Sequence, residues 1–375
     1  MTKTLRFCRK IRVSPNCSIR SAKAPAVSSF CPPLRKTAHT RSTSIRIVAL
    51  GGGTGLSMLL RSLKEHIARP RQNSASRPIS DIAAIVTVTD DGGSSGRLRR
   101  EYSILPPGDI RNCMVALSPD EALLGKLFQY RFPSGRGRGL AGHSFGNLFL
   151  AALTNVTGDF SEAVRLSAKV LAIRGRIFPS TRANVTLEAE LEGGRIVAGE
   201  TNISHSRRRI RRVRLVPPGA GPLPEALEAI HEADLIILGP GSLYTSIIPN
   251  LLVRGVAHAI RRSRAECIYI ANLMTQPGET DGYSVADHVR AIYEHAHERL
   301  FDHVVVNRAP ATSQILRRYG VQGAKPVEAS LEELRRMGVR YITGDLLQQD
   351  GVVRHDPKRL AQLLLLRHFS QRERS

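Results

Sequence analysis

One stretch restricts the fold of this chain more than any other. The largely apolar residues 45–50 lead directly into Gly51-Gly52-Gly53-Thr54-Gly55, and a second largely apolar stretch, residues 56–63, follows at once. This order is typical of a buried parallel strand, a tight turn and a helix that begins over the turn. Glycines allow positive φ angles and close approach of a ligand, and a helix N-terminus presents free N–H groups to an anion. The stretch predicts a phosphate-binding first turn in a doubly wound α/β domain.

The spacing of the glycines excludes two common nucleotide-binding turns. The dinucleotide fingerprint G-x-G-x-x-G needs a glycine where Leu56 stands, and no Lys-Ser/Thr pair follows as it would in a Walker loop. Two interpretations stay open. One is a purely structural turn, and the other is a phosphate cradle built from Gly52, Gly53 and Gly55 with the hydroxyl of Thr54.

Two later strands also end in glycine-rich loops. Residues 81–89 lead into Asp90-Asp91-Gly92-Gly93-Ser94-Ser95-Gly96, and residues 234–238 lead into a loop with Gly241 and Ser242. Ligands collect at the carboxyl ends of parallel strands, so we expect these loops to face one crevice. Asp90 and Asp91 suit Mg²⁺, hydrogen bonds from a base or ribose, or capping of the following turn. Ser242 is positioned to donate to a phosphate.

Five further polar residues are candidates for the same crevice. Asp109 follows a Pro-Pro-Gly turn, where it serves either as the N-cap of a helix through residues 113–117 or as a catalytic acid, and Asn112 falls in the first turn. His143 and Asn147 belong to Gly-His-Ser-Phe-Gly-Asn, which is not a nucleophile elbow because no strand precedes it. They either line the site or make structural hydrogen bonds. Asn272 ends the strand predicted over residues 267–272.

The second half of the chain adds an antiparallel unit and two arginine features. Residues 185–191 alternate strictly and return after a glycine turn over residues 196–200, so a hairpin is predicted to be inserted into the mostly parallel sheet, whose two faces are covered by helices. The arginine-rich residues 207–214 predict a solvated edge strand or loop, with a polyanion contact as the alternative. Arg354 precedes a helix predicted over residues 358–367, where it either clamps a phosphate or lies on the surface.

Charge and cysteine content indicate which class of ligand and which cellular compartment suit this protein. The chain has 375 residues and a formal net charge of +23. Such a balance favours anionic ligands, but sparse aromatic residues and the lack of a zinc-finger or RNA-recognition motif do not favour nucleic acid. No apolar stretch is long enough for a membrane span. The five cysteines form no C-x-x-C pair, so neither a zinc site nor a disulfide frame is indicated, and a reducing compartment fits.

The first 43 residues differ from the rest, because they are rich in Lys and Arg and contain no acidic residue. This composition predicts either an organellar transit peptide or a disordered extension. We therefore predict one α/β domain over residues 44–368, preceded by this basic segment and followed by a tail over residues 369–375.

Six motifs, taken together and in this order, resemble the gluconeogenesis factor family (YvcK-like), a branch of the 2-phospho-L-lactate transferase (CofD-like) superfamily. They are residues 51–55, 90–96, 107–112, 143–147, 239–244 and 276–280, and the likeness spans residues 45–367. The resemblance implies a Rossmann-like fold and a cytoplasmic role in cell shape and cell-wall homeostasis during gluconeogenic growth. It also implies binding of UDP-sugars such as UDP-N-acetylglucosamine, in which Thr54 and Arg354 match the family's ligand-binding threonine and arginine.

Further expectations follow from the resemblance. A nucleotide-sugar-binding regulator requires no cofactor, and it is compatible with a protein partner in cell-wall synthesis and with a homo-oligomer. The transferase branch instead moves a phospholactyl group from a guanosine diphosphate donor to a deazaflavin alcohol with Mg²⁺, and there Asp90 and Asp91 match aspartates at the site. A nicotinamide oxidoreductase is disfavoured by the glycine spacing. An organellar location is the alternative to the cytoplasm if residues 1–43 are a transit peptide.

Overall fold

The computed structural model describes residues 44–67, 79–119, 123–133, 139–349 and 352–372. The predicted basic segment, residues 1–43, lies outside the described residues, as do residues 134–138 and residues 373–375 of the predicted tail. The described residues belong to one compact unit, Ser42–Ser375.

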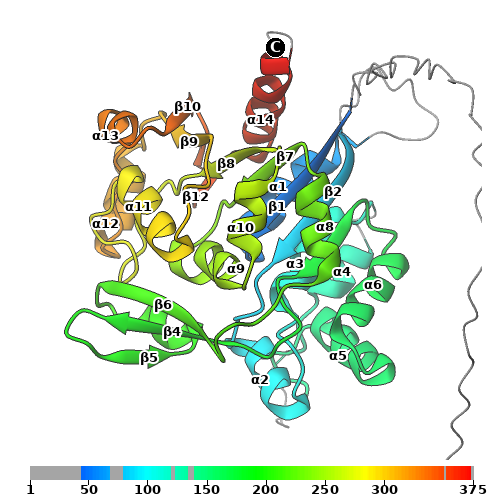
Figure 1. Cartoon of the computed structure of the whole chain (residues 1–375). Helices are drawn as coiled ribbons and strands as arrows, with labels where there is room; N and C mark the ends of the chain where they lie inside the picture. Colours follow the sequence, from blue (N-terminus) through cyan, green and yellow to red (C-terminus); the bar gives the residue numbers. More distant parts are fainter. Residues whose placement is uncertain (1–43, 68–78, 120–122, 134–138, 350–351, 373–375) are drawn as a thin grey trace, which may run out of the picture. The chain divides into compact units, whose positions relative to one another are not determined.

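A seven-stranded parallel sheet forms the centre of this unit, in the order β10-β9-β8-β7-β1-β2-β3 (Figure 1). Its strands are β1 Ile45–Gly51, β2 Ile79–Val86, β3 Arg176–Pro179, β7 Leu235–Leu238, β8 Glu266–Ile270, β9 His303–Asn307 and β10 Arg340–Gly344. In the middle of the sheet, Ala49 of β1 lies opposite Ala84 and Ile237. Strands buried on both faces are near-continuously apolar, as the central strands β1, β2 and β7 are. The predicted α/β fold is confirmed.

The order of the strands reverses at β1. The chain moves outward from β1 through β2 to β3, and in the other direction from β7 through β8 and β9 to β10. Right-handed crossovers then place the connecting helices on opposite faces. Helices α1 Thr54–Lys64, α3 Gly108–Leu117 and α14 Pro357–Arg372 pack together, with α1 in contact with both others. Helices α8 Pro224–Glu232, α9 Ile248–Leu252, α10 Val256–Arg262 and α11 Val285–Ala296 form the second group. Open α/β sheets bind ligands at such a reversal, here between β1 and β7.

The other helices are shorter or lie toward the edges of the sheet. They are α2 Gly93–Tyr102, α4 Leu124–Gln129, α5 Phe145–Thr157, α6 Phe160–Val170, α7 Glu200–His205, α12 Ser313–Val321, α13 Leu331–Arg336 and the π-helical turn η2 Leu243–Ile247. Within the described residues, no helix combines the length and the apolar composition needed to cross a membrane.

The predicted hairpin belongs to a separate antiparallel sheet. Strands β4 Thr186–Leu191, β5 Ile196–Ala198 and β6 Ile210–Val216 pair in the order β5-β4-β6, so the arginine-rich strand is an edge strand, as predicted. Two of its arginines form ion pairs with β4, Arg214 with Glu188 at 2.8 Å and Arg211 with Glu190 at 3.3 Å. Strands β11 Leu347–Gln349 and β12 Val353–His355 form a further antiparallel pair.

Some elements differ from the prediction. The Gly-Ser run after Asp91 is expected to be a loop but begins helix α2, because Leu98 on that helix is buried and fixes it to the protein. Residues 325–328 make only single bridges, between Met274 and Pro326 and between Ser284 and Glu328. Strand β3 and helix α13 are not predicted, since each is too short to show a clear hydrophobic period.

Candidate functional site

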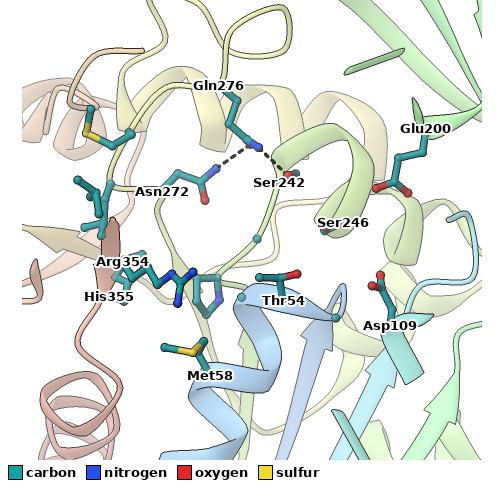
Figure 2. A pocket seen from close by; sticks show the side chains of 17 residues that line it. Thr54, Met58, Asp109, Glu200, Ser242, Ser246, Asn272, Gln276, Arg354 and His355 are labelled. Carbon is teal, nitrogen blue, oxygen red and sulfur yellow. Dashed lines mark hydrogen bonds between the residues drawn. The ribbon is translucent and has the colours of Figure 1, made fainter. Parts of the chain in front are cut away.

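A cleft of about 420 Å³ lies where the strand order reverses (Figure 2). Six segments far apart in the chain line it: the turn between β1 and α1, the first turns of α3 and α7, the loop after β7, the loop after β8, and strand β12. Three of the lining segments thus follow the carboxyl ends of neighbouring parallel strands, as expected for a ligand site in this class of fold. The expectation of one shared crevice holds for these loops.

The glycine turn after β1 forms the floor of the cleft. Gly53 precedes α1 with a φ of −79°, and none of residues 51–55 has a positive φ. Space, not backbone conformation, requires glycine here. A Cβ atom on Gly53 would lie 2.3 Å from Oδ1 of Asp109, and one on Gly55 would lie 2.2 Å from the carbonyl oxygen of Pro240. The positive φ angles that glycine allows are therefore not used in this turn, and the close approach of Asp109 and Pro240 to the main chain is what requires glycine at these positions.

Thr54 is the first residue of α1, and its side chain is exposed and lines the cleft. The N–H groups of a first helical turn have no partners within the helix, and the helix dipole places positive potential there. No side chain caps this helix. The turn therefore offers backbone donors and one hydroxyl to an anion, as a phosphate site requires.

The loop after β7 contributes Gly241 and Ser242 to the opposite wall. The hydroxyl of Ser242 accepts a hydrogen bond of 2.7 Å from Nε2 of Gln276, whose Oε1 lies 3.4 Å from Nδ2 of Asn272. Because Ser242 accepts this bond, its own hydroxyl proton remains available for a ligand. Ser242 and Asn272 are candidates from the sequence, whereas Gln276 is an added lining residue.

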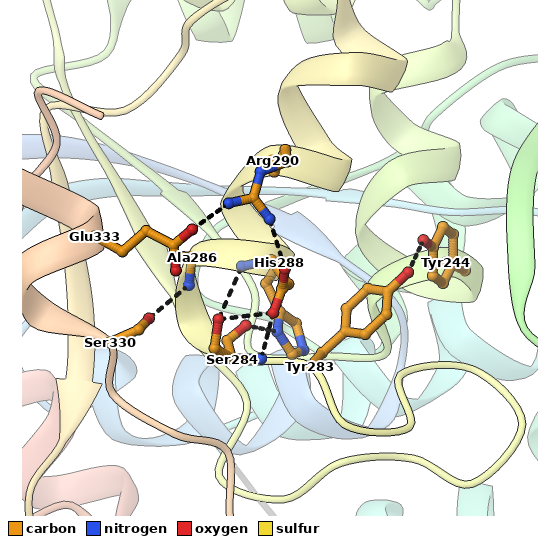
Figure 3. A network of polar contacts seen from close by, with 9 residues as sticks. Tyr244, Tyr283, Ser284, Ala286, His288, Arg290, Ser330 and Glu333 are labelled. Carbon is orange, nitrogen blue, oxygen red and sulfur yellow. Dashed lines mark hydrogen bonds and ion pairs between the residues drawn. The ribbon is translucent and has the colours of Figure 1, made fainter. Parts of the chain in front are cut away.

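The loop that carries Ser242 continues into η2, whose Tyr244 belongs to a network of polar contacts outside the cleft lining (Figure 3). Tyr244 is buried, and its hydroxyl lies 2.8 Å from that of Tyr283. The next residue, Ser284, caps α11 reciprocally with Asp287: its Oγ accepts from the Asp287 N–H at 3.2 Å, and Asp287 Oδ2 accepts from the Ser284 N–H at 2.9 Å. This capping box fixes Tyr283, and through it the position of η2.

Loss of this cap should be measurable. We expect Ser284→Ala to lower the free energy of unfolding by about 1 kcal/mol, because the Asp287 N–H loses its acceptor. Urea denaturation of the two proteins would measure the difference. An unchanged unfolding midpoint would mean that the capping box does not support α11.

A negative wall faces the glycine turn from the other side. Asp109 lies in the first turn of α3, whose N-cap is Pro107, so the prediction that Asp109 is the N-cap is wrong. Instead its carboxyl lines the cleft and takes a backbone hydrogen bond from Gly53. Burial, and then the charge of Asp90, raises the pKa of Asp109 to about 7, against the opposing effects of the Gly53 hydrogen bond and Arg111.

Glu200 is the second acid of this wall and is not among the candidates from the sequence. It begins α7, immediately after the predicted hairpin, and lines the cleft. Burial raises the pKa of Glu200 well above its usual range, and the carboxylates of Asp109 and Asp90 add to the effect. Figure 2 shows Asp109 and Glu200 on one side of Thr54 and Arg354 on the other. The cleft therefore has two carboxyl groups at one end and an arginine at the other.

Asp90 and Asp91 do not line this cleft. Oδ1 of Asp90 accepts from the Gly92 N–H at 2.9 Å, which is the turn-capping alternative. Oδ1 of Asp91 accepts from the N–H and the hydroxyl of Thr201, at 2.9 and 2.7 Å, at the start of α7. The two carboxyls are thus held by different elements, and the contact of Asp90 with Gly92 corresponds to the turn-capping alternative. Among the described residues, no group of three or more His, Cys, Asp or Glu side chains could hold a metal ion.

Three other candidates form a separate polar cluster that does not line the cleft. His143 Nδ1 lies 3.0 Å from Oγ of Ser94, which accepts from Nδ2 of Asn147 at 3.1 Å. Asn112 accepts from Arg111 at 2.7 Å. Both His143 and Asn147 are buried, and burial lowers the pKa of His143. For these residues the structure shows the structural hydrogen-bonding alternative.

Strand β12 brings the C-terminal part of the chain to the cleft. Arg354 lines it with an exposed side chain, and His355 lines it beside Arg354. Burial lowers the pKa of His355 to about 4, so its imidazole is neutral near pH 7. Arg354 is thus the cation of this wall, in the position expected of a phosphate clamp.

Comparison with known proteins places these residues in a wider group. The profile of the family described as 2-phospho-L-lactate transferase CofD matches residues 47–347. The gluconeogenesis factor of Bacillus subtilis is 49% identical over 321 residues, which cover 85% of this chain and 97% of that protein. The gluconeogenesis factor of Halalkalibacterium halodurans is 47% identical over 320 residues, covering 85% and 95%.

A solved structure shares the fold. The crystal structure of a UPF0052 family member from Bacillus halodurans superposes with a TM-score of 0.80 and 45% sequence identity, covering 86% of this chain and 99% of that one. The family profile covers five of the six segments that line the cleft and ends before strand β12.

Proposed function

We propose that the cleft binds the diphosphate of a nucleotide sugar. This chain belongs to the CofD family and to its gluconeogenesis factor branch, and that membership supports the proposal. The observation that carries the proposal is the convergence of the N-terminus of α1, Thr54, Ser242 and Arg354 on one cavity. The ligand we name is a UDP-sugar such as UDP-N-acetylglucosamine. In this proposal the protein is a cytoplasmic regulatory factor needed for cell shape and cell-wall homeostasis during gluconeogenic growth.

The chemistry of the wall supports an anionic ligand of extended shape. Backbone N–H groups at a helix N-terminus and a guanidinium are the two commonest phosphate donors in proteins, and both are present. The amide-bearing side chains of Asn272 and Gln276 offer donors and acceptors suited to the edge of a base or a sugar hydroxyl. A cavity of about 420 Å³ is within the usual range for a small-molecule site.

Thr54→Ala tests the cradle. We expect the affinity for UDP-N-acetylglucosamine to fall about tenfold, since one hydrogen bond to a charged group is lost. A thermal-shift titration would show a smaller rise in melting temperature for the variant than for the wild type. The matched control is Ser57→Ala on the same helix, whose hydroxyl donates to the carbonyl oxygen of Thr54 at 2.9 Å and does not line the cleft. No melting shift of the wild-type protein with any UDP-sugar would exclude the proposal.

The family match also supports a second candidate, a phospholactyl-type transferase that uses a nucleoside-diphosphate-activated donor and Mg²⁺. Among the residues present, Asp109 and Glu200 would best hold a magnesium ion, because both carboxyls line the cleft. Burial, and then the charges of neighbouring carboxylates, raises the pKa of each, and a bound cation would offset this effect. A bound ion would neutralise phosphate charge there. A transfer product formed from activated phospholactate and a deazaflavin alcohol would support catalysis. Binding of UDP-sugars without any turnover would favour the regulator.

A further inference from the structure

We propose a second anion-binding site, formed by Arg335, Arg340 and Arg367 at the opposite end of the central sheet. His303 and Arg340 are the first residues of β9 and β10, so this pocket lies at the amino ends of the strands, whereas the nucleotide-sugar cleft lies at their carboxyl ends. Its volume is about 590 Å³. The two cavities share no lining residue, and the proposal does not depend on what the cleft binds.

The charge of the pocket is its main feature. Its lining, within the described part of the chain, contains three arginines and neither aspartate nor glutamate; the residues are His303, Arg335, Gly338, Val339, Arg340, Tyr341, Ile342 and Arg367. Asp302 lies 3.6 Å from Arg340, but both side chains are largely exposed, at 44% and 65%, and such pairs attract weakly. Three guanidinium groups around one cavity repel one another, so an anion between them is favoured.

Arg335 is held in place by a neutral partner. Its guanidinium donates a hydrogen bond to the hydroxyl of Tyr341 and lies 5.3 Å from the centre of the same ring. A phenol orients the guanidinium without neutralising it, and a planar guanidinium held in one orientation matches two oxygens of a phosphate. The side chain is thus preorganised while its charge is kept.

Arg367 is held through a buried histidine. Nη2 of Arg367 lies 2.9 Å from Nε2 of His303. Because arginine can only donate a hydrogen bond, Nε2 is the acceptor, and the proton of the imidazole is on Nδ1. Nδ1 lies 3.0 Å from Oε1 of Glu266. Burial alone would raise the pKa of Glu266, but the neighbouring imidazoles of His303 and His368 lower it to about 2, so this carboxylate stays charged. Glu266 thus contacts one nitrogen of the His303 ring, and the other nitrogen of this ring holds Arg367 at the pocket.

The ligand class follows from this arrangement. Three guanidinium groups contributed by α13, β10 and α14 suit a compact anion with more than one charge, and phosphate groups meet that need better than a single carboxylate. We therefore assign the pocket to a small phosphorylated anion. A phosphate carried by a lipid head group offers the same chemistry, and vesicles that contain a phosphorylated lipid form the second arm of the test.

The test uses the full chain and inorganic pyrophosphate. The ring signals of His303, assigned with a His303→Gln variant, are followed by NMR, since they report on this pocket and not on the cleft. We expect a saturable shift that weakens with added salt. In an Arg335→Gln/Arg340→Gln variant the concentration needed should rise at least about tenfold. The control Arg336→Gln removes the adjacent charge on α13, outside the pocket, and should titrate like the wild type.

Two results would overturn the proposal. One is the absence of a saturable His303 shift in the wild-type protein. The other is an equal weakening in the Arg336→Gln control, which would show general attraction to a basic surface. Thermal unfolding of the double variant checks that it is folded, since both arginines are exposed and their loss should leave the melting temperature nearly unchanged. A His303 shift with phosphorylated-lipid vesicles but not with pyrophosphate would assign the pocket to a membrane surface and contradict the small-anion assignment.

Discussion

Replacement of Gly55 by alanine is expected to destabilise the protein by about 3 kcal/mol and to abolish ligand binding in the cleft. The added Cβ would lie 2.2 Å from the carbonyl oxygen of Pro240 and 2.8 Å from its carbonyl carbon. Both are backbone atoms of the loop that carries Gly241 and Ser242, so no side-chain rotation can relieve the contact. The loop after β7 would have to move away from α1, and the two walls of the phosphate cradle would separate.

Urea denaturation would measure the loss of stability, and Gly320→Ala provides the matched control. Gly320 lies in α12, and a Cβ atom there would meet nothing within 4 Å. Alanine at this position should be neutral or stabilising by about 0.5 kcal/mol, because it reduces the freedom of the unfolded chain. If Gly55→Ala were as stable as the wild type, α1 and the loop after β7 would not lie as close as the structure places them.

Asp109→Asn is expected to tighten binding of UDP-N-acetylglucosamine above neutral pH and to remove most of its pH dependence. In the wild type the pKa of Asp109 is raised from 3.8 to about 7 by burial and by Asp90. The carboxyl is neutral below that pH and charged above it. It lines the same cleft as the groups that we propose bind the diphosphate. Affinity for the anion should therefore fall as the pH rises through about 7 in the absence of a divalent cation. Added Mg²⁺ should reduce the effect.

The same substitution should change stability with a defined sign. Because the folded-state pKa of Asp109 is raised, ionisation disfavours the native state. This cost is absent below the unfolded value near pH 4 and complete above about pH 7, where it reaches at most roughly 4 kcal/mol. Asp109→Asn removes the cost, so its stability gain should grow between about pH 4 and about pH 7. Glu228→Gln, which removes a charge from an exposed position on α8, should show neither effect.

Calorimetric titration at about pH 6 and about pH 8 would measure the affinities, and denaturation at the same pH values the stabilities. Wild-type binding that does not change over this range would contradict the placement of Asp109 against Gly53. If binding by the Asp109→Asn variant still depends on pH, another group must titrate over this range. Glu200 is the first candidate, because its carboxyl interacts with the charge of Asp109.

The sequence predicts the parts of the cleft that are fixed by strand ends. The turn around Thr54, the loop with Ser242, and Asn272 each follow a buried strand, and parallel strands bring their carboxyl ends to one edge. Arg354 is found by its position before a helix, although β12, which places it, is only three residues long. Local apolar periodicity and chain topology suffice for these residues.

The direction in which a side chain leaves a loop is not predicted in this way. Asp90 and Asp91 follow a strand end as Ser242 does, yet Asp91 is captured by Thr201, which is 110 residues away in the sequence. Glu200 reaches the cleft only because the antiparallel sheet ends beside it, and Asp109 because Gly53 leaves room for its carboxyl. These placements depend on packing between segments that are far apart in the sequence, and the local hydrophobic periodicity of the sequence does not predict such packing.

The phosphate cradle is tested most directly by calorimetric titration of the full chain with UDP-N-acetylglucosamine and, separately, with uridine. If the N-terminus of α1, Ser242 and Arg354 hold a diphosphate, the nucleotide sugar should bind at least about tenfold more tightly than uridine, which lacks the phosphates, and Arg354→Ala should remove most of that difference. Equal affinities for the two ligands, or no heat with the nucleotide sugar, would contradict a diphosphate site in this cleft.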